Sequence, residues 1–361
     1  MTGGQRRSPS SADPLIEPVA PPLRVSVLGA GSWGTTFGKV LVDAGCDVLL
    51  WARRPEIARS IAATGRNPDY LPHIRLPVGL RATSDCAQAM EHARDLLVLA
   101  VPSQTLRSNM AEWAPAVDPG AVVVSLAKGI ELGSGLRMSE VIVGVSGIDF
   151  QRVAVVSGPN LAEEIAREQP TATVVACEDS ARAQLVQRAC TTRYLRPYTN
   201  PDIVGCELAG AMKNVIALAC GIVSGMKLGD NATASVIARG LAEITRLGHL
   251  LGADPMTFAG LAGLGDVVAT CYSRLSRNRG FGELLGRGQS MSQAQLRNPQ
   301  VVEGVTSSLA VRDLALRLGV DMPLTDQIVK ICHEDATPAQ AFDELMARKP
   351  QAEFGIVSMQ Y

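Results

Sequence analysis

The spacing G-x-G-x-x-G, placed directly after an apolar run, is the feature that most restricts what this chain can fold into. Gly29, Gly31 and Gly34 form it, the strand-like residues 23–28 precede it, and the helix-forming residues 35–44 follow it. In this context the first glycine permits a tight turn, the second lets backbone approach a pyrophosphate, and the third allows helix to pack on strand. The helix adds free N–H groups and the positive end of its dipole. We therefore predict a dinucleotide-binding unit near the N-terminus.

The apolar pattern along the rest of the chain predicts two domains. Strands are expected at residues 24–28, 47–51, 96–101, 121–126, 153–157, 172–177 and 193–198, alternating with helices, which is typical of a parallel, doubly wound sheet. Beyond these the strand pattern stops, and helices are expected at 206–224, 231–251, 255–272, 279–287, 306–318, 324–334 and 338–347. We expect an α/β Rossmann-type domain at 23–205 and an all-α domain at 206–350, with tails at 1–22, disordered, and at 351–361.

Composition removes several classes of function. The 361 residues carry 34 basic and 35 acidic side chains, a net charge of −1, so no field favours nucleic acid or an anionic membrane. Glycine or a charged residue interrupts every apolar run, so no membrane-spanning segment is expected. The eight cysteines show no metal-ligand spacing and the four histidines are scattered, so we expect no metal site and a reducing, cytoplasmic setting.

The end of the second predicted strand bears on the choice of cofactor. In NAD-selective folds an acid about 20 residues after the glycines binds the ribose 2′-hydroxyl. This strand ends in Arg53 and Arg54, with no acid at its tip. Two guanidinium groups suit a 2′-phosphate, although a solvated basic pair is the alternative. We favour NADP(H) and keep NAD(H) as an alternative.

Lys213 is the strongest candidate for chemistry. It lies within the apolar stretch 208–219, and no acid stands three or four residues from it. An unpaired buried ammonium is costly, and burial lowers a lysine's pKa, which suits proton exchange with a substrate hydroxyl. The alternative is a lysine whose stem packs at a helix surface while its head reaches water.

Two further charges stand out in the helical half. Asp266 is alone among the Gly, Ala and Leu of residues 260–265, so its partner should be Lys213 or a polar substrate, unless it caps a helix. By contrast, Arg239 and Glu243 stand four residues apart in the helix expected at 231–251 and are most simply a surface pair.

Polar side chains also gather at two other places. Ser276, Arg277, Asn278 and Arg279 form a tight cluster that suits a small phosphate, or else a solvated basic loop. Lys128 and residues 157–160 each follow a predicted strand, at the carboxyl edge of the sheet where open α/β folds bind ligands.

Together these motifs resemble bacterial NAD(P)-dependent glycerol-3-phosphate dehydrogenases, which interconvert dihydroxyacetone phosphate and sn-glycerol 3-phosphate. The matching segments occur in the family's order between about residues 24 and 325. They are residues 29–34, 127–129, 157–159, 213–214, 229–231, 263–266, 276–279 and 301–304.

The resemblance implies roles for particular residues. Lys213 would donate and accept the proton, and the substrate would be bound by Lys128, Gly158, Asn160, Lys213, Asp266, Ser276, Arg277 and Asn278. Besides the three glycines, the cofactor would contact Ser32, Trp33, Arg53, Arg54, Lys128, Ala162, Arg277, Val301 and Glu303. Asn160 departs from the Ser or Thr expected in the family, although its amide can still hydrogen-bond.

The implied activity is reduction of dihydroxyacetone phosphate to feed glycerophospholipid synthesis, with a homodimer allowed. Two alternatives stay open. One is a related dehydrogenase acting on a β-hydroxy acid, whose carboxylate would replace the phosphate at Arg277. The other is an NADP(H)-sensing protein without catalysis, against which the isolated charges of Lys213 and Asp266 argue.

Overall fold

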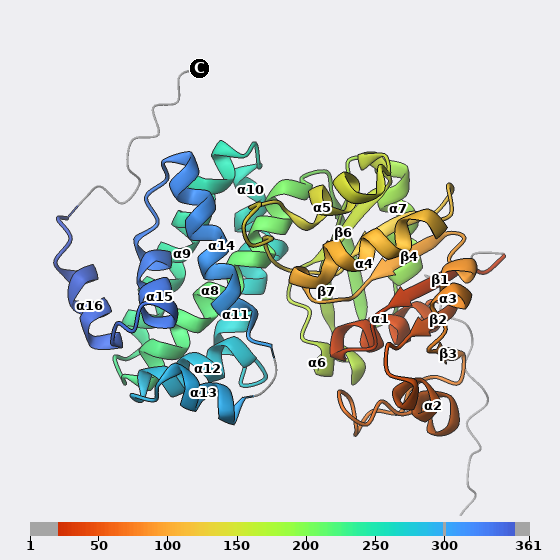
Figure 1. The fold of residues 1–361 in the computed structure, drawn as a ribbon, viewed down its shortest axis with the longest axis horizontal. Helices are drawn as coiled ribbons and strands as arrows, with labels where there is room; N and C mark the ends of the chain where they lie inside the picture. Colours follow the sequence, from red (N-terminus) through yellow and green to blue (C-terminus); the bar gives the residue numbers. More distant parts are fainter. Residues whose placement is uncertain (1–20, 299–300, 351–361) are drawn as a thin grey trace, which may run out of the picture.

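The computed structural model describes residues 21–298 and 301–350, which fold into an α/β domain and a helical domain (Figure 1). The expected tails, 1–22 and 351–361, lie outside the described residues except for Pro21 and Pro22. The last strand ends at Asn200 and the first long helix of the second domain begins at Ile203. The domain boundary expected after residue 205 thus falls in the first turn of that helix, and it stays a prediction.

The α/β domain is built on one eight-stranded sheet. Its strands lie in the order β3-β2-β1-β4-β5-β6-β7-β8, and their chain order reverses between β1 and β4. In open α/β sheets this reversal marks the ligand crevice, and the glycine motif follows β1. The strands are β1 (Arg24–Leu28), β2 (Asp47–Trp51), β3 (Leu80–Thr83), β4 (Leu96–Leu99), β5 (Val122–Ser125), β6 (Val153–Ser157), β7 (Thr171–Ala176) and β8 (Leu195–Asn200).

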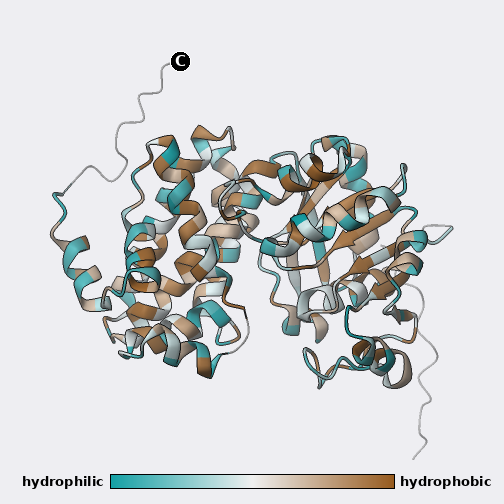
Figure 2. Ribbon diagram, viewed as in Figure 1, coloured by the Kyte–Doolittle hydropathy of each residue, from teal (hydrophilic) through white to brown (hydrophobic). Residues whose placement is uncertain are grey.

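Helices cover both faces of this sheet, which is why its central strand β4 is apolar throughout and its neighbours are mostly apolar. In β4, Leu96 and Val98 pack in one core while Leu97 and Leu99 pack in the other. Figure 2 shows these strands as hydrophobic. One face carries α1 (Ser32–Asp43), α2 (Pro55–Thr64), α6 (Ala162–Ala166) and α7 (Ser180–Cys190), and the other carries α3 (Cys86–His92), α4 (Leu106–Trp113) and α5 (Met138–Ser146).

One strand pair departs from the parallel pattern, because β7 runs antiparallel to β6. The connection holds α6, a helix of only five residues, which is about 8 Å long. A five-residue strand such as β6 spans roughly 17 Å, so α6 is too short to carry the chain back to the amino ends of the strands, where a parallel strand would have to begin. The chain therefore turns back at the carboxyl edge, and β8 then pairs parallel with β7.

Strand β3 was not expected from the sequence. It has four residues at one edge of the sheet, of which Leu80 is buried and Arg81 is exposed. A strand this short, with little apolar alternation, has no strong sequence signature.

In the helical domain, the other helices pack around the long apolar helix α8. This helix alone among the described helices is long and apolar enough to cross a membrane, but 89% of its apolar window is buried in the domain, as in a core helix. The helices are α8 (Ile203–Gly225), α9 (Asp230–Leu250), α10 (Pro255–Ala259), α11 (Asp266–Tyr272), α12 (Arg277–Gly286), α13 (Met291–Arg297), α14 (Glu303–Leu318), α15 (Pro323–His333) and α16 (Pro338–Met346). Helix α13 was not expected from the sequence.

The single helix expected at residues 255–272 is wrong. The chain leaves α10 at Gly260, makes a π-helical turn over Leu261–Gly265, and restarts as α11 at Asp266. A Cβ atom on Gly263 would stand 2.1 Å from the carbonyl oxygen of Phe258, so only glycine fits at this position of the turn. The break makes Asp266 the first residue of a new helix.

The surface pair expected between Arg239 and Glu243 is also wrong. Glu243 is 1% exposed and accepts hydrogen bonds from the backbone N–H groups of Leu324 and Thr325 and from the Thr325 hydroxyl. Its carboxylate thus binds the N-terminal end of α15, and burial raises the pKa of Glu243 to about 7.

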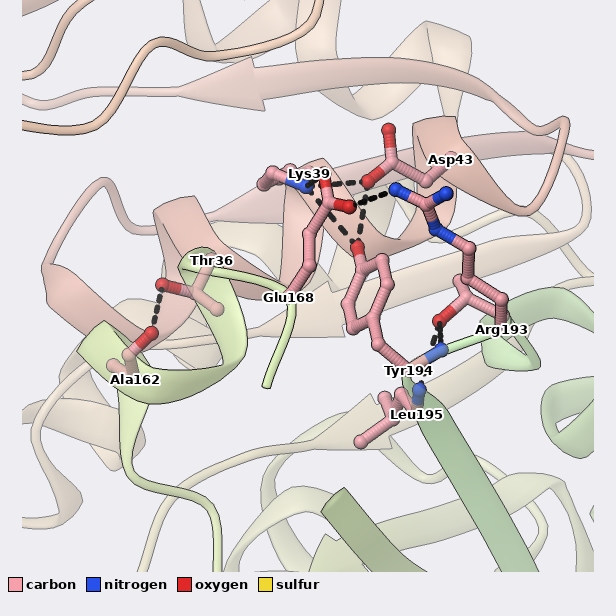
Figure 3. Close-up of polar contacts among 9 residues, drawn as sticks. Thr36, Lys39, Asp43, Ala162, Glu168, Arg193, Tyr194 and Leu195 are labelled. Carbon is pink, nitrogen blue, oxygen red and sulfur yellow. Dashed lines mark hydrogen bonds and ion pairs between the residues drawn. The ribbon is translucent and has the colours of Figure 1, made fainter. Parts of the chain in front are cut away.

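An ionic cluster around the buried Lys39 side chain, which we call the Lys39 cluster, holds α1 against the start of β8 (Figure 3). Lys39 donates to Asp43 (2.6 Å), Glu168 (3.2 Å) and the hydroxyl oxygen of Tyr194 (3.3 Å). The Tyr194 hydroxyl donates to Asp43, and Arg193 pairs with Glu168. All three N–H groups of Lys39 therefore have partners inside the protein.

Candidate active site

A cleft of about 860 Å³ runs along the carboxyl edge of the sheet, with walls from both domains. Most of the predicted site residues line it: Gly29, Gly31, Ser32, Trp33, Gly34, Arg53, Arg54, Lys128, Asn160, Ala162, Lys213, Ser276, Arg277, Asn278, Val301 and Glu303. The other two, Gly158 and Asp266, do not line the cleft. They lie behind its wall and contact the lysines that do.

Asp266 joins lysines from the two domains. It is 1% exposed, and its two carboxylate oxygens accept from Lys128 Nζ at 2.5 Å and from Lys213 Nζ at 2.8 Å. Lys128 follows β5, whereas Lys213 comes from α8, so this single carboxylate bridges the two domains. Lys213 has no acidic partner three or four residues away on its own helix, and Asp266 of α11 supplies one.

The remaining contacts of these lysines leave donors for a ligand. Lys213 also donates to the Thr270 hydroxyl at 3.1 Å, and Lys128 donates to the Gly158 carbonyl oxygen at 3.0 Å. An ammonium has three N–H groups, so each lysine keeps one that the contacts described here do not use. Thr270 was missed by the sequence analysis. It stands one helical turn after Asp266 on α11, and that spacing could have suggested it.

Burial and charge act against each other in this group. Burial lowers the pKa of Lys128 to about 8, assisted by the positive charge of Lys213 and opposed by Asp266. Burial alone would raise the pKa of Asp266, but Lys128 and Lys213 together lower it. Two ammonium groups on one carboxylate leave an excess positive charge at the cleft wall.

The glycine motif has the shape that a dinucleotide requires. Gly29 has φ +124°, and a Cβ atom there would stand 2.4 Å from the Ala100 carbonyl oxygen. A Cβ atom on Gly34 would stand 2.0 Å from the Gly29 carbonyl oxygen, so α1 packs as closely on β1 as expected. A Cβ atom on Gly31 would meet no protein atom within 4 Å, which leaves space beside the backbone for a pyrophosphate.

Two residues that line the cleft near this motif have buried polar atoms without partners in the described chain. These atoms are Trp33 Nε1 and both amide atoms of Asn160. Buried polar groups are nearly always hydrogen-bonded in folded proteins, so these atoms fit contacts to a bound molecule. Ala162 opens α6, and its carbonyl oxygen accepts from Thr36 of α1, which ties α6 to the cofactor helix (Figure 3).

A side-chain network closes the other end of the cleft. Asn278 donates to Asn214, accepts from the Gly304 N–H, and thereby joins α12 to α8 and α14. Asn214 in turn donates to Glu303, and burial raises the pKa of Glu303 even though Arg277 and the two lysines lower it. Asn214 was not among the predicted site residues, although it follows Lys213 directly.

Ser276 and Arg277 begin α12 at the same end. Ser276 is the N-cap, accepting from the Arg279 N–H, and Arg277 is exposed in the cleft. Three residues of the cluster expected from the sequence, Ser276, Arg277 and Asn278, thus line the same cleft as the paired lysines, whereas Arg279 does not.

The sequence analysis assumed that no acid stands near the end of β2, and the structure corrects this. Arg54 donates to the carboxylate of Asp69, 15 residues further along the chain. An acid therefore does lie at the end of β2, although it does not come from β2. The sequence could not reveal it, because Asp69 belongs to the loop between α2 and β3.

A dinucleotide fold whose cleft also contains paired lysines and a basic cluster defines a class, the nicotinamide-dependent dehydrogenases that act on small anionic substrates. The N-terminal domain of NAD-dependent glycerol-3-phosphate dehydrogenase matches residues 24–183, and the C-terminal domain of the same family matches residues 202–343. The chain belongs to this family.

Individual proteins give the same result. The chain is 59% identical over 332 residues to a glycerol-3-phosphate dehydrogenase (NAD(P)+) of Streptomyces avermitilis, covering 92% of this chain and 98% of that one. It is 57% identical over 336 residues to the enzyme of the same name from Nocardia farcinica, covering 91% and 99%. The crystal structure of a glycerol-3-phosphate dehydrogenase from Coxiella burnetii superimposes with a TM-score of 0.85 at 38% identity, covering 91% of this chain and 99% of that one.

Proposed function

We propose that this oxidoreductase catalyses the reversible reduction of dihydroxyacetone phosphate to sn-glycerol 3-phosphate with NAD(P)H and so supplies glycerophospholipid synthesis. The observation that carries the proposal is the Lys128–Asp266–Lys213 group, which opens into the same cleft as the glycine motif and Arg277. The cleft therefore combines groups for proton transfer, dinucleotide binding and phosphate binding.

The residues that would hold the cofactor lie along one side of the cleft. Gly31 and the N-terminus of α1 would hold the pyrophosphate, and Arg53 and Arg54, which line the same cleft, would hold the adenosine ribose. Trp33 and Asn160 supply polar atoms that have no partner in the described chain. When bound, the reduced nicotinamide supplies a hydride to the substrate's carbonyl carbon.

Lys213 supplies the proton in this proposal. Asp266 and Thr270 hold its Nζ atom with two hydrogen bonds, so the third N–H can be directed at the substrate's carbonyl oxygen. As that oxygen gains negative charge, Lys213 passes it a proton, and in the oxidative direction Lys213 takes the proton back. Asp266 acts as a positioning residue, because it contacts the two lysines rather than the cleft.

Lys128 stabilises the same developing charge. Its ammonium shares Asp266 with Lys213, and the excess positive charge of these two largely buried side chains favours an alkoxide beside them. At the far end of the cleft, Arg277 and Ser276 bind the phosphate and orient the carbonyl group. Asn278 supports them through its bonds to Asn214 and Gly304.

Absorbance at 340 nm tests the proposal directly. Purified protein mixed with dihydroxyacetone phosphate should oxidise NADPH, and in a second reaction NADH, with loss of absorbance. No substrate-dependent oxidation of either cofactor, by protein that still binds NADPH, would reject the proposed reaction.

The β-hydroxy acid alternative can be tested in the same assay. A cleft that binds phosphate at Arg277 should be inhibited competitively by inorganic phosphate, and the protein should be far slower with β-keto acids than with dihydroxyacetone phosphate. The reverse order of rates would favour a carboxylate substrate.

A cytoplasmic location and a homodimer belong to the same proposal. All eight cysteines are free thiols and six of them are buried, which is consistent with a reducing compartment. Light scattering of the purified protein would give the mass of the particle and so test the dimer.

A further inference from the structure

The two arginines at the end of β2 are not equivalent. Both line the cleft, and no hydrogen bond or ion pair of the Arg53 guanidinium is found within residues 21–298 and 301–350. Arg54, in contrast, is hydrogen-bonded to Asp69 and also lies 3.9 Å from Glu56. The hydrogen bond to Asp69 is the main cause of a raised Arg54 pKa. One arginine is available to a phosphate, and the other already has a carboxylate partner.

The position of Asp69 is built into the fold. Two residues before it, Asn67 is 0% exposed and donates both to the Ala30 carbonyl oxygen, in the glycine motif, and to the Thr35 hydroxyl of α1. One residue after it, Tyr70 lines the cleft. Asp69 therefore stands between a residue anchored to the cofactor loop and a residue of the cleft wall.

A carboxylate at this place affects the two cofactors differently. The 2′-phosphate of NADP(H) carries a charge close to −2, so it must take Arg54 from Asp69 or bind beside that negative charge. The 2′-hydroxyl of NAD(H) is uncharged and meets no such repulsion. Acids near this ribose are known to favour NAD(H).

We propose that Asp69 is a specificity-determining residue that competes with the 2′-phosphate for Arg54 and so reduces the preference for NADP(H) over NAD(H). The inference rests on the proposed function in that the same cleft binds a nicotinamide dinucleotide. It adds Asp69, which lies in the loop between α2 and β3, to the residues that determine cofactor preference. It also assigns Arg53 as the main ligand of the 2′-phosphate.

The test is the Asp69→Asn enzyme, in which shape is kept and the charge is removed. The ratio of kcat/KM for NADPH to that for NADH, both measured with dihydroxyacetone phosphate, should rise about fivefold, the upper range for an ion pair as exposed as this one. Arg54 and Asp69 keep 45% and 44% of their side-chain surface exposed, so the effect should shrink as salt is added. An unchanged or lower ratio overturns the proposal.

Two further variants separate the Arg54 contact from general charge. Glu56→Gln removes a charge of the same sign near Arg54 but no hydrogen bond, and it should change the ratio less than about twofold. In an Arg54→Ala background, Asp69→Asn should no longer raise the ratio, because the group for which Asp69 competes is gone. An equal rise in that background, or an equal rise with Glu56→Gln, would contradict competition for Arg54.

Binding measurements distinguish a failure of this proposal from a failure of the proposed function. The Kd values of NADPH and NADH, obtained from quenching of protein fluorescence without substrate, should shift in the same direction and by the same factor. If dihydroxyacetone phosphate is not reduced while these Kd values shift as expected, the proposed reaction fails and the role of Asp69 stands. If turnover is normal and the Kd ratio is unmoved, the role of Asp69 fails alone.

Discussion

Two ionic clusters in this protein are each built around largely buried lysine side chains, and they differ in whether charge and N–H donors remain unpaired. In the Lys39 cluster, two cations (Lys39 and Arg193) face two carboxylates (Asp43 and Glu168), and every N–H of Lys39 has a partner. At the cleft, two lysines share one carboxylate, and each keeps an N–H without a partner among the described residues. The first cluster is closed and serves the fold, whereas the second has spare charge and spare donors.

The difference teaches how a functional lysine can be recognised. Burial alone does not distinguish the two, since the Lys39 side chain is 5% exposed and that of Lys213 is 12% exposed. The sequence separates them better, because Asp43 stands four residues after Lys39 and no acid stands near Lys213. A lysine whose charge is balanced on its own helix is expected to be structural.

The largest expected effect is that of Lys213→Ala on turnover. Loss of the proton donor should lower kcat by about 100- to 10,000-fold, with the melting temperature little changed. Steady-state assay and thermal unfolding of the same preparation measure both quantities. A variant that keeps near-normal kcat would break the distinction between the two clusters, since Lys213 would then be structural as well.

Lys39→Met should give the opposite result. The substitution keeps the aliphatic stem but leaves Asp43 without a cation and Glu168 with Arg193 alone, which should cost roughly 2–3 kcal/mol of unfolding free energy. This is less than for a fully buried pair, because Glu168 keeps 37% of its side-chain surface exposed. Urea unfolding measures the loss, and kcat of the folded enzyme should stay within about twofold of the original. A large fall in kcat at unchanged stability would show that the closed cluster is not merely structural.

Arg277→Ala sharpens the comparison at the phosphate end of the cleft. Removing a charge-assisted contact should raise KM for dihydroxyacetone phosphate by roughly 10- to 100-fold, with a smaller change in kcat. Arg279→Ala is the matched control, because it belongs to the same basic cluster but does not line the cleft. Equal effects of the two variants would mean that general positive charge, rather than Arg277 itself, attracts the substrate.

The smallest expected effect is a shift in pH dependence. Reduction should slow as pH rises through about 8, because Lys128 then loses the proton that makes it cationic. Asp266 raises the pKa of Lys128, so Asp266→Asn should lower this pKa and move the alkaline limb of kcat/KM to lower pH, by about one unit. Lys128→Arg should abolish the limb, since a guanidinium stays charged. A limb that stays in place in both variants would assign it to another group.

Much of the fold could be predicted because it rests on local patterns. Strands buried on both faces, such as β4 and β5, are continuous apolar runs, and helices such as α9 and α15 have regular apolar faces. The failures come from features that the apolar pattern does not show. The antiparallel turn to β7 depends on the length of α6, and the break before α11 depends on contact between Gly263 and Phe258.

The site was predicted as separate pieces, and the structure supplies the connections. Lys213 was one of the two partners expected for Asp266, and the structure pairs them. The pairing of Arg54 with Asp69 could not be foreseen, because it depends on how the loop after α2 folds back. Glu243 looked like half of a surface pair because its true partners, the first N–H groups of α15, are 81 and 82 residues away.

The close approach of Gly263 to the Phe258 carbonyl group affects how sequence variants of this enzyme should be interpreted. Gly263 does not line the cleft, but the turn that it allows places Asp266 at the start of α11. Adding a single methyl group there would push the Phe258 carbonyl or the turn aside and so displace the carboxylate that both lysines share. In a saturation screen scored by growth, this position should tolerate no substitution and would be scored as catalytic, although it meets no ligand.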